Sequence, residues 1–205
     1  ALIESGLKKD EAIFNVLREY IKQSKSIMFE GDGYSDNWAE EAKKRGLNNL
    51  KTTPEALAKE LDQKFIDLYE GLGVFTKREQ EARNEIKLEK YCTVIDIEAR
   101  VLADIARNHI IPAALNYQNR LIENVKGLKE IFGDEEFKVL GKEQISLITQ
   151  ISANVSNIKV GVDNLLQEKE TAKNLEDNHL KAKSYCDKVK PLFDKVVVES
   201  IGTEE

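Results

Sequence analysis

The sequence predicts an all-α protein: a bundle of long amphipathic helices that includes a coiled-coil-like antiparallel hairpin, with short helices near the N-terminal third. Along most of the 205 residues, apolar side chains recur every three or four positions, the period of one face of an α-helix. Charged residues make up 33% of the chain, whereas prolines number three and glycines eleven, so helix breakers are rare. The β-branched run at 196–198 is too short for a strand and lies within a helical pattern.

The first helices are bounded by clear stop signals. A helix is expected from Asp10 to Phe29, because the turn sequence of residues 30–33 follows it. Ser35 is placed to cap a second, short helix, and Gly46 to end it, since serine accepts from free backbone N–H groups and glycine adopts the left-handed conformation of a C-cap.

A third helix is expected to begin at Thr53 and Pro54, with the threonine as its cap and the proline in its first turn. Its apolar pattern runs to the glycines at 71 and 73, with a possible break near Asp62. We interpret these glycines as helix stops rather than a phosphate-binding loop, because the third glycine and the preceding strand of a dinucleotide loop are missing.

The longest helical pattern follows a capping box. In this motif the side chains of Thr76 and Glu79 each satisfy a free backbone donor at the start of a helix. Apolar positions then recur as far as residue 128, and Pro112 interrupts them. Because proline removes a helical hydrogen bond, we expect a kink or a short break at this point.

The last third of the chain predicts the hairpin. Positions 148, 151, 155, 158, 162 and 165 are all Ile, Val or Leu and alternate in steps of three and four, as in a coiled-coil seam. A polar turn over 173–178 precedes a second apolar stripe from Leu180 to Val196, so we expect the two stripes to pack within one chain. The expected division is 1–132, with one long Pro-kinked helix, and 133–205, a long hairpin packed on it as part of one domain.

Charge and cysteine content limit the function classes. The formal net charge is −6, and a nucleic-acid surface would need a basic face, so we expect no nucleic-acid partner. Cys92 and Cys186 are far apart and have no second cysteine nearby, which excludes a local CxxC site and favours a reducing, cytoplasmic compartment. No stretch approaches about 20 apolar residues, so we expect no membrane partner.

Metal sites fit the sequence poorly. A carboxylate-bridged metal bundle needs two Glu-x-x-His motifs, and only Glu176 to His179 matches, whereas His109 lacks the glutamate. A calcium loop starting at Asp32 would need a closing glutamate where Lys43 stands. We expect ordinary histidines and no metal site.

Other candidates for catalysis have plain structural interpretations. Cys92 and Cys186 lie on or near apolar helical stripes, where a cysteine usually acts as a small core residue. Asp96, Glu98 and Asp104 alternate with basic residues on one predicted helix, which is typical of a solvated, ion-paired face. The sequence therefore predicts no catalytic, cofactor-binding or metal-binding residue in this chain.

Four stretches together resemble a known family. They are GDGYSDNW at 31–38, EEAKKRGLNNLKTTPEAL at 40–57, GVFTKRE at 73–79 and IEARVLADIARNHIIPAALNYQNRLIENVKGLKE at 97–130. Their order and spacing are similar to the C-terminal region of type III glutamine synthetases, over about residues 10–130 and more loosely through the hairpin. The end of the chain lacks the Trp-Pro tail of that family.

The resemblance implies a parent enzyme that ligates ammonia to glutamate with ATP and a divalent metal, magnesium or manganese, as a ring-shaped homo-oligomer. It also implies that the metal, nucleotide and phosphate ligands lie upstream in a β-containing catalytic core, so that this chain alone lacks the catalytic residues. On this hypothesis the chain is a C-terminal segment that braces the core of the same polypeptide and helps subunits assemble. The alternative is a free-standing helical adaptor that binds protein partners through its hairpin.

Overall fold

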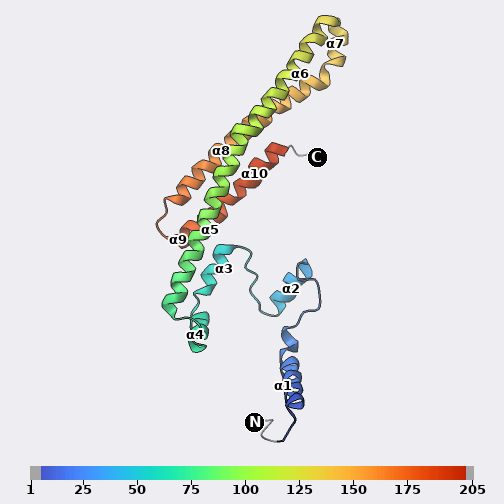
Figure 1. The fold of residues 1–205 in the computed structure, drawn as a ribbon. Helices are drawn as coiled ribbons and strands as arrows, with labels where there is room; N and C mark the ends of the chain where they lie inside the picture. Colours follow the sequence, from blue (N-terminus) through green and yellow to red (C-terminus); the bar gives the residue numbers. More distant parts are fainter. Residues whose placement is uncertain (1–5, 202–205) are drawn as a thin grey trace. The chain divides into compact units, whose positions relative to one another are not determined.

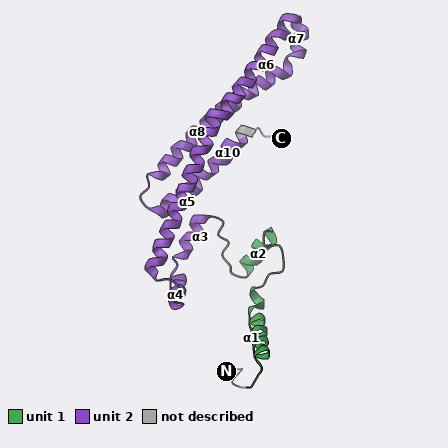
Figure 2. Cartoon of the chain, viewed as in Figure 1, with its two compact units in different colours: residues 1–49 green, residues 50–205 purple. Residues whose placement is uncertain are grey.

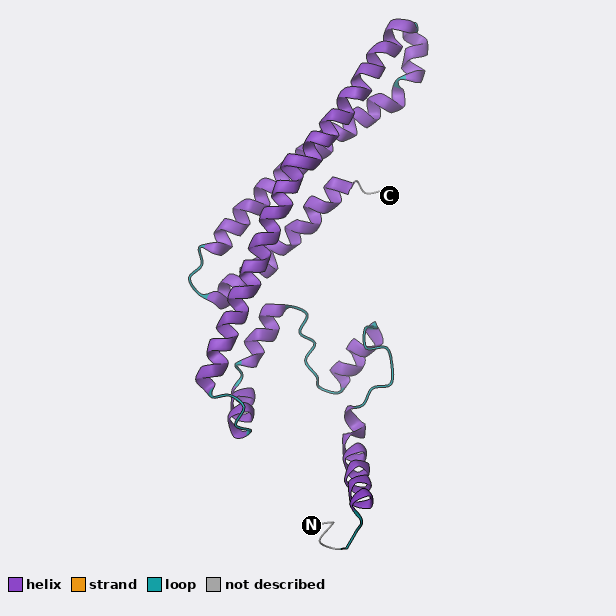
Figure 3. Cartoon of the chain, in the orientation of Figure 1, coloured by secondary structure: helices purple, strands orange, loops and turns teal. Residues whose placement is uncertain are grey.

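The computed structural model describes residues 6–201, and every regular element within that range is helical. Figure 3 shows helices joined by loops along this part of the chain, which confirms the predicted all-α fold. No helix among the described residues has the length and apolar character needed to cross a membrane.

The chain folds as two compact units, residues 1–49 and residues 50–205 (Figure 2). The division expected from the sequence at 132/133 falls inside the second unit.

The first unit contains α1 (Lys9–Ser24), a 3₁₀ turn (Lys25–Ile27) and α2 (Asp36–Lys44). The first helix therefore ends before the expected Phe29, and the 3₁₀ turn continues it for three residues. Phe29 packs against Trp38 of α2, with ring centroids 4.5 Å apart. Arg45 donates to the carbonyls of Ser26 at 3.2 Å and Met28 at 2.9 Å, so the end of α2 fixes the backbone that follows α1.

The predicted caps of α2 are correct in position but differ in chemistry. Ser35 is the N-cap residue, yet its hydroxyl donates to the Asp32 carbonyl at 2.7 Å instead of accepting from a helix N–H. Gly46 follows the helix with φ of 73°, the left-handed conformation that glycine adopts without steric cost.

The second unit begins with α3 (Thr53–Glu60) and α4 (Gln63–Gly71), and the possible break near Asp62 is confirmed. The cap of α3 is Thr52 rather than the expected Thr53, since the Thr52 hydroxyl accepts from the N–H of Glu55 at 3.4 Å. Thr52 and Thr53 both carry a hydroxyl that could cap the helix, but Thr52 has the extended backbone dihedrals of an N-cap residue.

The predicted capping box opens α5 (Lys77–Ile105). The Thr76 backbone N–H donates to the Glu79 carboxylate at 2.8 Å, and the Glu79 N–H donates to the Thr76 hydroxyl at 3.3 Å. Both hydrogen bonds of the motif are present. The Thr76 N–H and the Thr76 hydroxyl, which both donate to the Glu79 carboxylate at 2.8 Å, hold the pKa of this carboxyl below its usual value.

The sequence predicts a kink or a short break at Pro112, and the structure has no break there. A π-helical turn (Ala106–Ile110) joins α5 to α6 (Ile111–Ile131), and the Ile111 N–H donates to the carbonyl of Ala106, five residues back. The proline then lies in the first turn of α6, where its missing N–H costs little. The irregularity predicted at Pro112 is thus a π turn placed directly before it.

After α6 the chain turns and runs back alongside the continuous helix formed by α5, the first π turn and α6. This returning part comprises α7 (Asp134–Leu140), α8 (Lys142–Lys173), α9 (Asn178–Ser184), a second π turn (Tyr185–Val189) and α10 (Lys190–Ile201). The second π turn also ends two residues before a proline, Pro191, so the chain uses the same arrangement twice. In Figure 1, α8 runs antiparallel to α6 and α5, and α10 lies antiparallel beside α8.

The core of this unit lies where α8 packs between α5, α6 and α10. Three residues of the predicted seam, Ile158, Val162 and Leu165, are buried, and the partner helices belong to the same chain, as expected. Ile148 and Ile151 at the other end are half-buried, and the coiled-coil character of the seam stays a prediction. In the second stripe Val189 and Val196 are buried, but Leu180 is 60% exposed, because it points away from the helices that cover its neighbour Ala182.

Replacing Leu165 with alanine tests this packing. Leu165 is fully buried in the cluster that joins α5, α8 and the second π turn. The Leu165→Ala substitution is expected to lower the free energy of unfolding by about 2–5 kcal/mol, because it removes buried methyl groups and leaves a cavity. Urea denaturation followed by circular dichroism measures the change. Gln167→Ala, at an exposed position of the same helix, is the control, and equal effects of both substitutions would refute the packing.

Candidate functional site

The most unusual side chains of the second unit form a polar centre inside the helical packing. Asp96 of α5, Lys169 of α8 and Tyr185 of the second π turn meet there, and we call them the Asp96 centre. Lys169 Nζ lies 3.4 Å from Asp96 Oδ1, and the Tyr185 hydroxyl donates to the same oxygen at 3.4 Å. The other carboxylate oxygen lies 3.0 Å from Arg100 Nε, so one carboxylate links three segments of chain.

Two side chains of the Asp96 centre are almost completely buried, and burial affects the protonation of one of them. Lys169 is 8% exposed and Tyr185 2%, whereas a lysine is almost never buried unless it is paired. Burial, together with the negative charge of Asp96, raises the pKa of the Tyr185 phenol well above its usual value. The phenol therefore stays protonated at neutral pH and acts as a hydrogen-bond donor to the carboxylate, not as a base.

A groove of about 340 Å³ opens beside the Asp96 centre. Its lining includes Cys92 and Asp96 from α5 and two lysines, Lys173 and Lys181, on either side of the turn between α8 and α9. Burial raises the pKa of the Cys92 thiol, which keeps the sulfur protonated and a poor nucleophile. The Cys92 thiol and the Tyr185 phenol that line this groove are therefore both held protonated, whereas Glu89 adds a carboxylate to the lining.

A second polar cluster attaches α3 to the start of α5. Asn84 is 1% exposed and donates to the Leu57 carbonyl at 2.7 Å, and Gln80 donates to the carbonyl of Glu60. The Glu60 carboxylate in turn lies 2.7 Å from Lys87 Nζ. These bonds satisfy the last carbonyls of α3, which have no partner within their own helix.

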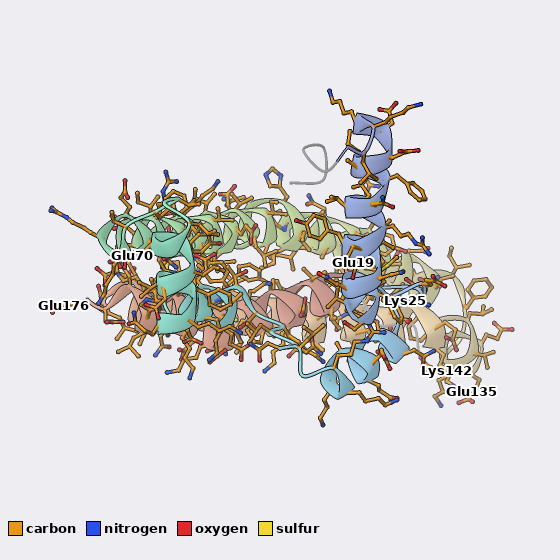
Figure 4. All side chains as sticks on the ribbon, turned by 90° about the horizontal axis from the view of Figure 1, so that it is seen from below. Glu19, Lys25, Glu70, Glu135, Lys142 and Glu176 are labelled. Carbon is orange, nitrogen blue, oxygen red and sulfur yellow. The ribbon has the colours of Figure 1, made fainter. Side chains whose placement is uncertain are left out.

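The residues singled out from the sequence for metal binding lie apart from these centres. His109 is exposed on the first π turn, His179 is half-buried in α9, and Glu176 lies in the preceding loop. Figure 4 shows Glu176 at one end of the bundle and Glu135 and Lys142 at the opposite end. Among the described residues no three His, Cys, Asp or Glu side chains are grouped so that they could hold a metal ion.

The remaining candidates behave mostly as predicted. Cys92 belongs to the core, and Cys186 is half-buried. Glu98 and Asp104 are exposed, as expected of a solvated face. Asp96 is the exception: its side chain is only 18% exposed, because α8 and the second π turn cover the edge of α5 on which it lies.

Sequence reasoning missed Lys169, Asn84 and Gln80 as buried polar residues. A signal was present for Lys169, because it continues the apolar stripe of Ile158, Val162 and Leu165 at the next helical step. Asn84 likewise precedes Leu88 by four positions on the buried face of α5. A polar residue in register with an apolar stripe indicates a buried hydrogen-bonding partner, but its identity requires the fold.

A double-mutant cycle tests the Asp96 centre. Asp96→Ala is expected to lower the free energy of unfolding by about 3 kcal/mol, because it removes the nearer carboxylate partner of the buried Lys169 ammonium and leaves only Glu170, at 3.7 Å. The double variant Asp96→Ala/Lys169→Met is expected to recover most of that loss, because it also removes the buried charge. Urea unfolding of the wild type, both single variants and the double variant measures the coupling. Additive effects would show that the two side chains do not interact.

Comparisons with known proteins agree with the family resemblance. The sequence model of the family described as "Glutamine synthetase C-terminal domain" matches residues 12–129. A glutamine synthetase of Bacteroides fragilis (strain YCH46) is 44% identical over 195 residues, which cover 95% of this chain and 27% of that protein. A type-3 glutamine synthetase of Dictyostelium discoideum is 29% identical over 196 residues, again 95% of this chain and 27% of the relative.

A glutamine synthetase of Butyrivibrio fibrisolvens is 35% identical over 127 residues, 62% of this chain and 18% of that protein. The chain thus spans about a quarter of the length of the Bacteroides and Dictyostelium relatives and less of the Butyrivibrio one. The family match extends over most of the first unit, α3, α4, α5 and most of α6. On these matches, the chain belongs to the family of glutamine synthetase C-terminal domains.

Proposed function

We propose that this chain braces the catalytic core of a glutamine synthetase and contributes to the packing of its subunits. The whole enzyme would ligate ammonia to glutamate with ATP and a divalent metal, magnesium or manganese, in the cytoplasm. Family membership supports this proposal over a free-standing adaptor. Two free cysteines are consistent with a reducing compartment.

The apolar stripe of α1 carries the proposal. Five large side chains on one face of this helix are between 48% and 63% exposed, and no other described element of the first unit covers them. They are Ile13, Phe14, Leu17, Tyr20 and Ile21. Burying each such side chain contributes roughly 1.5–3 kcal/mol, so a helix with this stripe is expected to pack against another surface.

The remaining part of a longer polypeptide is the surface we assign to this stripe. The relatives of known length are several times longer than the matched segment, which is 27% of two of them. Following the family resemblance, we assign ATP and metal binding to the catalytic core and no chemical step to this chain. Its contribution is mechanical: it holds the core and neighbouring subunits in place.

A charge placed on the stripe tests this function in the full-length enzyme. Leu17→Asp is expected to lower the stability of the assembled enzyme by roughly 2 kcal/mol or more, because it removes an apolar contact and would bury a carboxylate. Asn15→Asp introduces the same charge on the opposite side of α1 and is expected to have little effect. Thermal unfolding, mass photometry and glutamine formation from glutamate, ammonia and ATP provide the readouts.

The 205-residue chain without the core is expected to form no glutamine in the same assay. Glutamine formation by this chain alone would contradict the proposal. So would a Leu17→Asp enzyme whose melting temperature, assembly and activity equal those of Asn15→Asp.

A further inference from the structure

Helix α5 carries apolar stripes on two opposite faces. One face holds the core residues Leu88, Cys92, Ile95, Ala99 and Ala103, which are all buried. The other face holds five large aliphatic residues that are between 42% and 63% exposed, and we call them the outer stripe. They are Ile86, Val94, Ile97, Val101 and Ile105.

The outer stripe is unusual for a helix at the surface of a bundle. A helix that packs on one side normally presents polar residues on the other. Here the steps between the last four members of the stripe are three, four and four, so they follow one line along the helix. From Ile86 to Ile105 the stripe extends for roughly 28 Å at 1.5 Å per residue, and no described residue of the second unit covers it.

Charges within the outer stripe are arranged symmetrically about its middle. Lys90 lies seven residues before Ile97 and Asp104 lies seven residues after it, so both share the face of Ile97. Lys90 forms no ion pair or hydrogen bond with the described residues, and Asp104 accepts only from its neighbour Asn108, at 2.6 Å. A basic and an acidic side chain, neither of which forms an ion pair with the described residues, thus lie seven residues on either side of one central isoleucine.

The outer stripe is complementary to the outer stripe of a second copy that packs antiparallel against it. A two-fold axis through Ile97 places each Lys90 opposite the Asp104 of the other copy, which gives two equivalent ion pairs. Val94 and Val101, three residues before and four after the axis, then fill the gaps beside the central isoleucines. A uniformly acidic or basic partner would leave one of the two charges facing a like charge.

We propose that the outer stripe of α5 binds the same stripe of a second copy of this chain, antiparallel and centred on Ile97. This proposal rests on the subunit packing proposed above and names the surface that makes it. The proposed contact of α1 with the catalytic core is independent of this surface. A single pair of helices buries less than the roughly 800 Å² per partner of a standard interface. The chain alone is therefore expected to form a weak, reversible dimer.

Sedimentation velocity of the 205-residue chain across a concentration series tests this surface. The wild type is expected to shift from monomer to dimer as its concentration rises. Ile97→Asp is expected to stay monomeric, and because the Ile97 side chain is 46% exposed, circular dichroism should show an unchanged helix content. Lys90→Glu and Asp104→Lys are each expected to raise the dissociation constant about tenfold or more, since each creates two like-charge contacts.

Charge exchange provides the decisive comparison. The double variant Lys90→Glu/Asp104→Lys restores opposite charges across the two-fold axis and is expected to dimerise nearly as well as the wild type. Lys159→Glu, which makes the same charge change at an exposed position of α8, is the matched control and should leave the dissociation constant unchanged. A chain that stays monomeric at every concentration, or a double variant no better than its parents, would overturn the proposal. Neither result would change the outcome expected for Leu17→Asp.

Discussion

The burial of α8 between α5, α6 and α10 is the interaction on which the second unit depends. Ile158, Val162 and Leu165 lie on one line of α8 and are almost completely removed from water. These contacts join segments that are far apart in sequence. The second unit is therefore stable only when α5 and α6 have formed and α8 and α10 have packed against them. The short helix α3 then attaches to one end of α5 through the buried amides of Gln80 and Asn84.

This packing requires helices that remain continuous over long distances, and the two π turns make that possible. Pro112 and Pro191 would each remove a hydrogen bond from a helix interior, at a cost of about 3 kcal/mol. In both cases the π turn ends two residues earlier and lets the proline occupy a first turn. The rod of α5 and α6 and the return through α9 and α10 can therefore present apolar faces to α8 along their length.

Local chemistry allowed much of the fold to be predicted from the sequence. The capping box of Thr76 and Glu79, the left-handed Gly46 and the break near Asp62 depend only on neighbouring residues, and all three are present. The Asp96 centre could not be predicted, because Asp96, Lys169 and Tyr185 meet only once three segments pack together. The form of the irregularity at Pro112 was also open, since a kink, a break and a π turn all relieve the same clash.

The apolar surfaces that remain exposed connect this fold to its function. The stripe of α1 and the outer stripe of α5 are the surfaces through which we propose that this chain contacts the rest of the enzyme. If the rest of a glutamine synthetase covers α1, as we propose, the backbone amides of this helix are protected from solvent in the whole enzyme. Hydrogen–deuterium exchange of residues 9–24, compared between this chain and the full-length enzyme, measures that protection. Much slower exchange is expected in the full-length enzyme, and equal exchange in the two proteins would show that α1 is not covered there.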